Sequence, residues 1–245
     1  MMLNQAAMSE VSNHRVACVT GGAKRIGRAL VLALHQANYN VIVHYHTSES
    51  EAMELVDYCN AVRPQSVKSV QGDLEDFETL PQLTWRIINS FGRLDCLVHN
   101  ASRFYPTPFG QISQQDWQNL FLTNAQTPLF ISQYLYPYLK KSQGCIISIL
   151  DIHANGKPFG GYTVYNMAKA AHQMMVQSLA IELAPDIRVN GIAPGINILP
   201  IEGSEQALTT ETIEKICHAV PLKRIGTPQD IAQVAVFLAA APYIT

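Results

Sequence analysis

Short apolar stretches rich in β-branched residues alternate along the chain with longer amphipathic stretches. The short stretches carry few polar side chains, which is typical of strands buried on both faces of a parallel sheet. They are Arg15–Thr20, Asn40–Tyr45, Ser66–Gln71, Leu94–His99, Cys145–Leu150 and Ile187–Ile192. The longer stretches predict helices at Lys24–Ala37, Ser48–Val62, Phe77–Phe91, Ser113–Lys140, Tyr162–Leu183, Thr210–Ala219 and Pro228–Ala240.

This alternation predicts the fold class: an α/β domain with a doubly wound, Rossmann-like parallel sheet. Ligands of such sheets bind at the carboxyl ends of the strands. The last helix has a clear start signal, because Thr227 can cap it, Pro228 suits its first position and Asp230 completes a capping box. We expect residues 1–13 to be a flexible tail and residues 14–245 to form a single domain.

Composition narrows the class of protein. Of 245 residues, 15% are charged, against about 25% in an average domain. The formal net charge of −2 gives no sign of a nucleic-acid partner. The longest charge-free stretch, Trp117–Leu139, contains too many amides and hydroxyls to cross a membrane. Met1–Asn13 has no basic patch followed by an apolar run, so it does not resemble a signal peptide.

The five cysteines are odd in number and widely spaced, and three lie in the apolar strand-like runs. This usage is typical of a reducing compartment, where a thiol serves as a small core residue. We therefore expect a cytoplasmic protein.

A glycine-rich turn joins the first strand to the first helix. Gly21, Gly22 and Gly27 would let the backbone approach a pyrophosphate, and free N–H groups at the helix start attract anions. The spacing differs from Gly-x-Gly-x-x-Gly, because Arg25 stands near the place of the middle glycine. A tight turn without a ligand is the alternative.

The end of the second strand favours NADP over NAD. An NAD site places an acid there to accept from the ribose 2′-hydroxyl, but no acid occurs before Glu49. Donors or positive charge for a 2′-phosphate are available at Lys24, Arg25, His46 and Ser48. A metal pair of His44 and His46 is the alternative, but no third ligand lies nearby in sequence, so we predict no metal site.

Tyr165 and Lys169 are four residues apart and lie on one face of a predicted helix. An ammonium beside the phenol would lower its pKa and make Tyr165 a usable proton donor. Tyr136 and Lys140 have the same spacing, but they surround Pro137 and lie away from any strand end. A solvated Tyr and Lys is the alternative for either pair.

Motifs spread over nearly the whole chain after Asn13 resemble the short-chain dehydrogenase/reductase family. They are Thr20–Gly27, His99–Ala101, Asn124, Tyr165 with Lys169, Arg188–Asn190 and Pro194–Gly195. The resemblance implies hydride transfer with Tyr165 as proton donor, Lys169 on the nicotinamide ribose and Asn124 holding a proton-relay water. It also implies helix-pair dimers that assemble into a homotetramer.

Within that family the sequence is similar to the pteridine reductase branch. The residues that carry this similarity are Lys24–Gly27, His44–His46, Asn100–Pro108, Asp151 and Gly161–Tyr165. It implies NADPH-dependent reduction of dihydropterins, extended to oxidised pterins or dihydrofolate. The full set expected at the cofactor is Gly21, Lys24, Arg25, Ile26, Gly27, His44, Tyr45, His46, Ser48, Asp73, Leu74, Asn100, Ala101, Ser102, Lys169, Pro194 and Gly195.

Asp151 stands close to where carbonyl-reducing members of the family place a serine. A carboxylate would repel a developing alkoxide but can accept from the amino and ring N–H groups of a pterin. The spacing to Tyr165 is one residue longer than in the family, so Ile152 or His153 could take this place instead. Ser148 is another candidate for a hydroxyl role. A simple loop cap at Asp151 is the alternative.

Other side chains are expected to bind the substrate. Phe104 can stack on a flat ring, Tyr162 can line the same pocket, and Arg25 and Ser102 can reach polar edges of the ring. Phe104 as a core residue and Tyr162 as helix-start packing are the alternatives. The full set expected at the substrate is Arg25, Ser102, Phe104, Asp151, Tyr162 and Tyr165.

Two other functions compete with pterin reduction: reduction of 3-oxoacyl or other ketones, and NADP binding by a non-catalytic sensor. The irregular segment Ile196–Thr209 is expected to be a substrate lid. The family pattern also implies a further strand beyond Thr245.

Overall fold

The computed structural model describes residues 14–197 and 209–245. Its centre is a six-stranded sheet in which every pair of neighbours is parallel, in the order β3-β2-β1-β4-β5-β6. The strands are β1 (Val16–Val19), β2 (Asn40–Tyr45), β3 (Val67–Gln71), β4 (Cys96–His99), β5 (Cys145–Ile149) and β6 (Arg188–Ile192). All six predicted strands are confirmed, and the doubly wound sheet with them.

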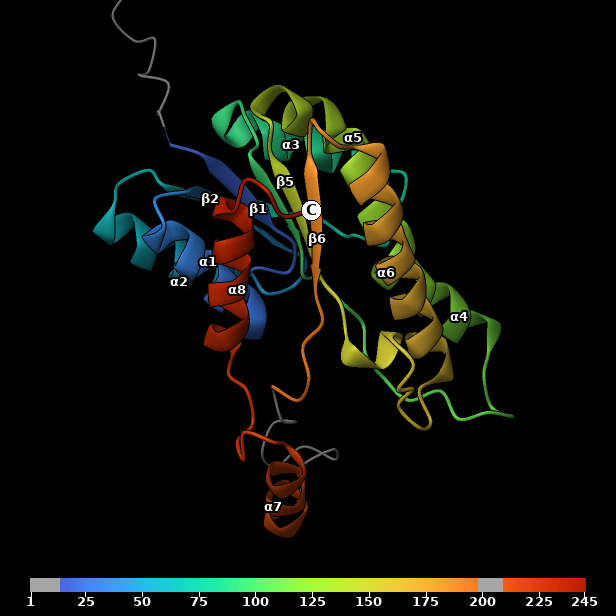
Figure 1. The fold of residues 1–245 in the computed structure, drawn as a ribbon. Coiled ribbons are helices and arrows are strands. Elements are labelled where there is room, and N and C mark those ends of the chain that lie inside the picture. The colour runs from blue at the N-terminus through green and yellow to red at the C-terminus, as the bar shows by residue number, and fades with distance from the viewer. Residues whose placement is uncertain (1–13, 198–208) are drawn as a thin grey trace, which may run out of the picture.

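Helices cover both faces of the sheet, as Figure 1 shows. Side chains of α1 (Arg25–Gln36), α2 (Glu49–Val62) and α8 (Pro228–Ala240) pack with β1 and β2 on one face. Side chains of α3 (Leu80–Phe91), α5 (Thr127–Ser142) and α6 (Thr163–Glu182) pack on the other. The central strands are therefore buried on both sides, which explains their continuous apolar sequence.

The predicted helix Ser113–Lys140 is interrupted. It consists of α4 (Gln114–Phe121), a π-helical turn η1 (Leu122–Gln126) and α5. Ser113 and Asp116 close a capping box at its start, and Gln143 ends it in the left-handed region at φ 50°. A π turn inserts one residue into an α-helix and often marks a functional site.

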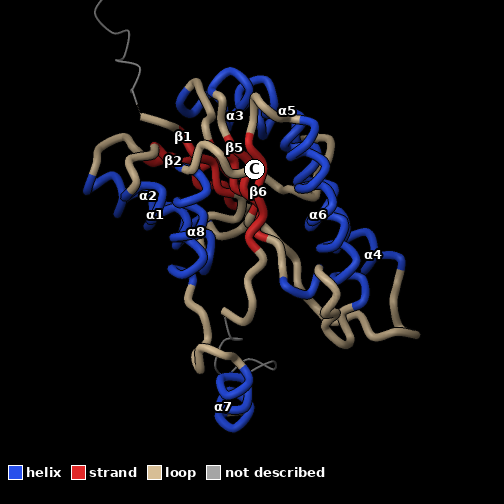
Figure 2. The backbone as a smooth tube through the Cα atoms, in the orientation of Figure 1, coloured by secondary structure: helices blue, strands red, loops and turns tan. Residues whose placement is uncertain are grey.

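α7 (Thr210–Ala219) buries none of its side chains, and in Figures 1 and 2 it stands apart from the layered sheet and helices. It is followed by α8, whose capping box of Thr227 and Asp230 is present as predicted. The chain then returns to β6, where Thr245 Oγ1 accepts from the Val189 amide at 2.9 Å and Asn190 Nδ2 donates to the Ile244 carbonyl.

All five cysteines are free, and all but Cys217 are buried. Within the described ranges, no helix is long and apolar enough to span a membrane. The predicted tail 1–13 and positions 198–208 of the predicted lid lie outside the described residues.

Candidate active site

The glycine turn after β1 is packed so closely that side chains are excluded. Gly21 has φ 60°, in the region that favours glycine. A Cβ atom on Gly27 would lie 2.1 Å from the Gly21 carbonyl oxygen and 2.8 Å from Asn100 Nδ2. Only glycine at position 27 allows α1 to begin this close to the strand. The turn therefore presents backbone without side chains, as the phosphate-binding turns of doubly wound sheets do.

Asn100 ties the turn to the end of β4. Its side-chain amide donates to the carbonyls of Thr20 at 2.9 Å and Gly21 at 3.0 Å. In return, Thr20 Oγ1 accepts from the amides of Asn100 and Ala101. β1 and β4 are neighbours at the point where the strand order reverses, which is the usual ligand site of a doubly wound sheet.

The ring of His44 holds the glycine turn through a hydrogen bond to its backbone. Its ring is 2% exposed, with the Gly21 amide donating to Nδ1 at 3.2 Å and Nε2 placed 3.1 Å from the Gly72 carbonyl. Burial lowers the pKa of His44 to about 4, so the ring is neutral and Nε2 donates. Both nitrogens are occupied by protein groups. Throughout the described ranges, no group of three His, Cys, Asp or Glu side chains is placed to hold a metal ion.

The residues expected at a 2′-phosphate lie around the end of β2 and the start of α1. Lys24 Nζ pairs with Glu51 at 2.6 Å, and His46 Nε2 lies 3.8 Å from Asp73 Oδ2. Arg25 is exposed with φ 52°, and Ser48 precedes α2 without a side-chain capping bond. These four residues therefore lie near one another at this corner, where Lys24 is paired with an acid, and their role at a 2′-phosphate stays a prediction.

Tyr165 and Asp151 are in direct contact. The Tyr165 hydroxyl donates to Asp151 Oδ2 at 2.7 Å, while Asp151 Oδ1 accepts from the His153 amide at 2.9 Å. Asp151 therefore faces the tyrosine and also caps the short 3₁₀ helix η2 (Ile152–Ala154). Because Asp151 itself contacts Tyr165, neither Ile152 nor His153 takes the position of the serine found in carbonyl-reducing members of the family.

The predicted lowering of the Tyr165 pKa is wrong for this arrangement. Burial and the adjacent Asp151 carboxylate raise the pKa of Tyr165 well above its usual value. Lys169 Nζ lies 5.9 Å from the centre of the Tyr165 ring and donates to the Ile149 carbonyl at 3.0 Å. Burial lowers the pKa of Lys169 to about 8, so the ammonium is still mostly protonated at neutral pH and loses its proton in mild alkali.

Aromatic rings gather beside Tyr165. Phe104 stacks on Tyr162 with ring centres 4.6 Å apart and meets Tyr165 edge-on at 4.8 Å. Phe159 extends the group, 4.6 Å from Tyr162. Phe104 is 54% exposed, so the alternative of a core residue is wrong. These rings form an accessible aromatic surface next to the Tyr165 hydroxyl.

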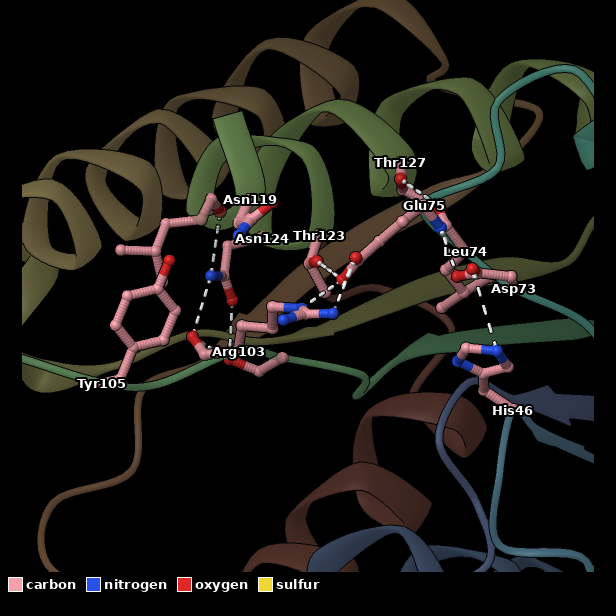
Figure 3. A network of polar contacts seen from close by, with 12 residues as sticks. His46, Asp73, Leu74, Glu75, Arg103, Tyr105, Asn119, Thr123, Asn124 and Thr127 are labelled. Carbon is pink, nitrogen blue, oxygen red and sulfur yellow. Dashed lines mark hydrogen bonds and ion pairs between the residues drawn. The ribbon is translucent and has the colours of Figure 1, made fainter. Parts of the chain in front are cut away.

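Asn124 lies in the π turn and is almost completely buried. Its Nδ2 donates to the carbonyls of Leu120 and Arg103, and its Oδ1 accepts from Ser102 Oγ at 2.6 Å. Figure 3 shows how this amide joins the π turn to the segment after β4. The side chain is thus fixed by hydrogen bonds to three other residues.

Sequence reasoning missed the ion pair that continues this network. The Arg103 guanidinium holds the Glu75 carboxylate, which also accepts from Thr123 Oγ1 at 2.8 Å (Figure 3). Thr127 Oγ1 donates to the Leu74 carbonyl at 2.7 Å. The loop after β3 is therefore fastened to the loop after β4 and to the π turn. Glu75 follows β3 and Arg103 follows β4, and β2 and β1 separate these strands in the sheet, so no local sequence pattern signalled the pair.

Other predicted residues divide into those near the site and those away from it. The Pro194 carbonyl accepts from the Ile152 amide at 3.2 Å, so Pro194 and Gly195 lie beside the Asp151 segment. Ser148 is buried within β5 and 3.0 Å from His172 Nε2, which removes it as a hydroxyl for substrate. In the other pair of the same spacing, Tyr136 and Lys140, the lysine forms an ion pair with Asp186 at 2.8 Å.

Comparisons with known proteins agree with this geometry. The family model described as enoyl-(acyl carrier protein) reductase matches residues 21–245. The chain is 34% identical to pteridine reductase 1 of Leishmania tarentolae, over 94% of this chain and 92% of that protein. It is 28% identical to the hydroxynaphthalene reductase-like protein Arp2 of Metarhizium acridum, over 92% and 88% of the two chains. With its sheet order, glycine turn and Tyr165–Lys169 helix, the chain belongs to the short-chain dehydrogenase/reductase family of oxidoreductases.

Proposed function

We propose that this oxidoreductase is an NADPH-dependent pteridine reductase, with Tyr165 as proton donor. The observation that carries the proposal is the 2.7 Å contact between the Tyr165 hydroxyl and the Asp151 carboxylate. The similarity to pteridine reductase 1 of Leishmania tarentolae supports the same substrate class.

Asp151 is the residue that favours a pterin over a ketone. A carbonyl oxygen gains negative charge as it is reduced, and a carboxylate close to the proton donor would repel that charge. A pterin presents amino and ring N–H groups, for which a carboxylate is a good acceptor. Phe104, half exposed and edge-on to Tyr165, offers a stacking surface for the flat ring.

The residues of the glycine turn fit a dinucleotide. Gly21 and Gly27 give the close backbone approach, Asn100 fixes the turn, and Lys169 lies where it can hold a ribose hydroxyl. When bound, NADPH supplies the hydride. The absence of an acid at the end of β2, with Arg25 and His46 exposed at this corner, favours the 2′-phosphate form.

The test is a cofactor-oxidation assay on the purified protein. We expect dihydrobiopterin to be reduced with NADPH, and reduction with NADH to be much slower. Oxidation of NADPH by an acetoacetyl thioester, without turnover of dihydrobiopterin, would overturn the pterin assignment. If neither substrate is turned over while NADPH still binds, the protein is the non-catalytic sensor.

A ketone reductase is the second candidate, favoured by the similarity to the hydroxynaphthalene reductase-like protein. The aromatic surface of Phe104, Tyr162 and Phe159 would also suit a fused-ring ketone. An assay with a naphthol-type ketone discriminates the two candidates. Because the Asp151 carboxylate should repel the charge that develops on a ketone oxygen, an Asp151→Ser variant should reduce the ketone faster than wild type does.

Three further proposals accompany this function. Residues 14–245 form one reductase domain, the enzyme is a homotetramer, and it works in the cytoplasm. The low content of charged residues and the free cysteines support the last two. Sedimentation of the purified protein tests the tetramer.

A further inference from the structure

An ion pair joins two chain segments that leave the sheet far from each other. Glu75 lies in the loop after β3, and Arg103 lies in the segment after β4. Neighbouring strands are about 4.8 Å apart, so three spacings put the ends of β3 and β4 about 14 Å from each other. The two segments and their ion pair therefore span the ends of β2 and β1, beside the glycine turn.

The Glu75 carboxylate is held from two sides. Both of its oxygens accept from the Arg103 guanidinium, with Nη2 donating to Oε2 at 2.7 Å, and Oε1 also accepts from Thr123 Oγ1 at 2.8 Å. A guanidinium that binds a carboxylate through two N–H groups fixes orientation as well as distance. Because Thr123 belongs to η1, the loop after β3, the segment after β4 and the π turn all meet at this carboxylate.

The exposure of the pair argues against a role in stability alone. The Glu75 side chain is 23% exposed and the Arg103 side chain is 45% exposed. Ion pairs this accessible to water contribute little to the free energy of unfolding, because solvent screens the charges. A pair with strict geometry and a small effect on stability is better suited to fix the relative position of the segments that carry it.

The loop after β3 carries residues expected at the cofactor. Asp73 Oδ1 accepts from the Glu75 amide at 2.9 Å, and Asp73 Oδ2 lies 3.8 Å from His46 Nε2 at the end of β2. The Leu74 carbonyl is tied to the start of α5 by a hydrogen bond of 2.7 Å. Through Glu75, Arg103 therefore helps to hold the conformation of Asp73 and Leu74.

The segment after β4 carries the ring expected to stack on the substrate. Arg103 directly precedes Phe104, which meets Tyr165 edge-on at 4.8 Å. The Arg103 carbonyl accepts from Asn124 Nδ2 at 2.9 Å, while its side chain points to Glu75 (Figure 3). Both ends of Arg103 are thus fixed, and a displacement of this residue would also move Phe104.

We propose that Arg103 and Glu75 are positioning residues that hold the cofactor loop after β3 and the Phe104 segment at a fixed separation. The proposal rests on the proposed places of Asp73 and Leu74 at the cofactor and of Phe104 at the substrate. Neither member of the pair touches a ligand. The pair acts on binding: without it, both segments lose part of their fixed geometry, and each ligand must then order the segment that it contacts.

Three substitutions break the pair in different ways. Arg103→Met removes the guanidinium and keeps much of the side-chain length. Glu75→Gln removes the charge but keeps an oxygen that can accept from Thr123. Arg103→Lys keeps the charge but loses the two-point geometry. Lys140→Met is the matched control, because it breaks a similarly exposed ion pair with Asp186, which lies before β6 at the opposite edge of the sheet.

We expect Arg103→Met to raise KM for NADPH and KM for the pterin about fivefold each, with kcat within about twofold of wild type. Arg103→Lys should recover part of both losses, and Lys140→Met should change neither KM. In the double variant of Arg103→Met and Glu75→Gln, the losses should equal those of one substitution, because a single interaction is removed.

Three results would overturn the proposal. One is an unchanged KM for either ligand in Arg103→Met, and another is a double variant in which the losses multiply. The third is a loss of thermal stability in Arg103→Met well beyond that in Lys140→Met, since this would indicate a structural role.

A second pair of measurements does not depend on turnover. The Glu75 amide, which donates to Asp73, should exchange its hydrogen faster in free Arg103→Met than in free wild type. The dissociation constant of NADPH, measured by fluorescence, should rise as well. Equal exchange and equal affinity in the two proteins would contradict us. If wild type binds NADPH but does not reduce pterins, the proposed function fails, and these two measurements still test the ion pair.

Discussion

The two halves of the proposed site are built in different ways, although both lie at the carboxyl edge of the same sheet. The proposed nucleotide half, around Gly21, Gly27 and Asn100, is shaped by backbone atoms packed so tightly that a Cβ on Gly27 would collide with them. The substrate half, around Asp151, Tyr165 and Phe104, consists of side chains, and one of its main rings is half exposed.

This difference indicates which half of the site can accept amino-acid substitutions. A backbone cradle tolerates almost no substitution, because its shape depends on the absence of side chains. A side-chain surface can exchange one group for another while the fold stays the same, which is how one fold serves many substrates. Substitutions should therefore separate cofactor binding from turnover.

The largest effect is expected from Tyr165→Phe. It removes the proposed proton donor and its bond to Asp151 but leaves the glycine turn unchanged, so turnover should fall by about 10³-fold or more. NADPH affinity, measured by fluorescence quenching, should stay within about threefold. Turnover close to wild type would exclude Tyr165 as the donor.

Acid should weaken the nucleotide half through His44. Its pKa is about 4 in the fold and 6.5 in the unfolded chain, so its contribution to stability is complete above pH 6.5. That contribution is lost as the pH falls from 6.5 to 4, because the unfolded chain then binds a proton that the folded ring refuses. The loss is on the order of 3 kcal/mol.

Urea unfolding at a series of pH values measures this effect. His44→Gln should flatten the curve but leave the contributions of His99, His172 and His35, whose pKa values burial also lowers. A His44→Gln curve as steep as that of wild type would show that His44 is not the titrating group.

Gly27→Ala should break the nucleotide half selectively. Its Cβ would stand 2.1 Å from the Gly21 carbonyl oxygen, so α1 must shift and NADPH affinity should fall by about 100-fold, together with some stability. Gly160→Ala is the control in the substrate half, since its Cβ would meet nothing within 4 Å. Equal NADPH affinities for both variants would contradict the cradle.

Phe104→Ala should give the smallest change and should affect the substrate half alone. Losing a stacking ring is expected to raise KM for the pterin about tenfold, since a ring pair contributes about 0.5–1.5 kcal/mol beyond burial. KM for NADPH should not change. Phe104→Tyr, which keeps the ring, is the matched control, and a rise in KM for both substrates would show a structural role instead.

Much of the fold follows from hydrophobic periodicity. β2, α7 and α8 have the predicted bounds, and most other elements differ by one or two residues at their ends. The π turn could not be predicted in this way, because Leu122–Gln126 keeps the composition of the helices on either side of it. One extra residue in a turn changes the hydrogen-bond pattern, but it changes the spacing of apolar residues too little for the π turn to be detected in the sequence.

The site was predictable to the extent that it depends on local motifs. The glycine turn and the Tyr165–Lys169 spacing each occupy a few consecutive residues, so the sequence contains them whole. The raised pKa of Tyr165 depends on burial and on Asp151, which the fold brings close. The buried cluster of His99, His172 and Ser148 joins three elements, and its visible signal was polar residues within apolar runs.

The π turn also constrains how this sequence can change in length. A π turn absorbs one extra residue, so the helices on its two sides keep the relative rotation that a regular helix one residue shorter would give them. Deleting one residue from Leu122–Gln126 should therefore leave Leu120 in its small apolar cluster, while the carbonyls of the turn return to the helical ladder. Such a deletion should be tolerated by the fold and should alter only the backbone groups that the turn presents beside Tyr165.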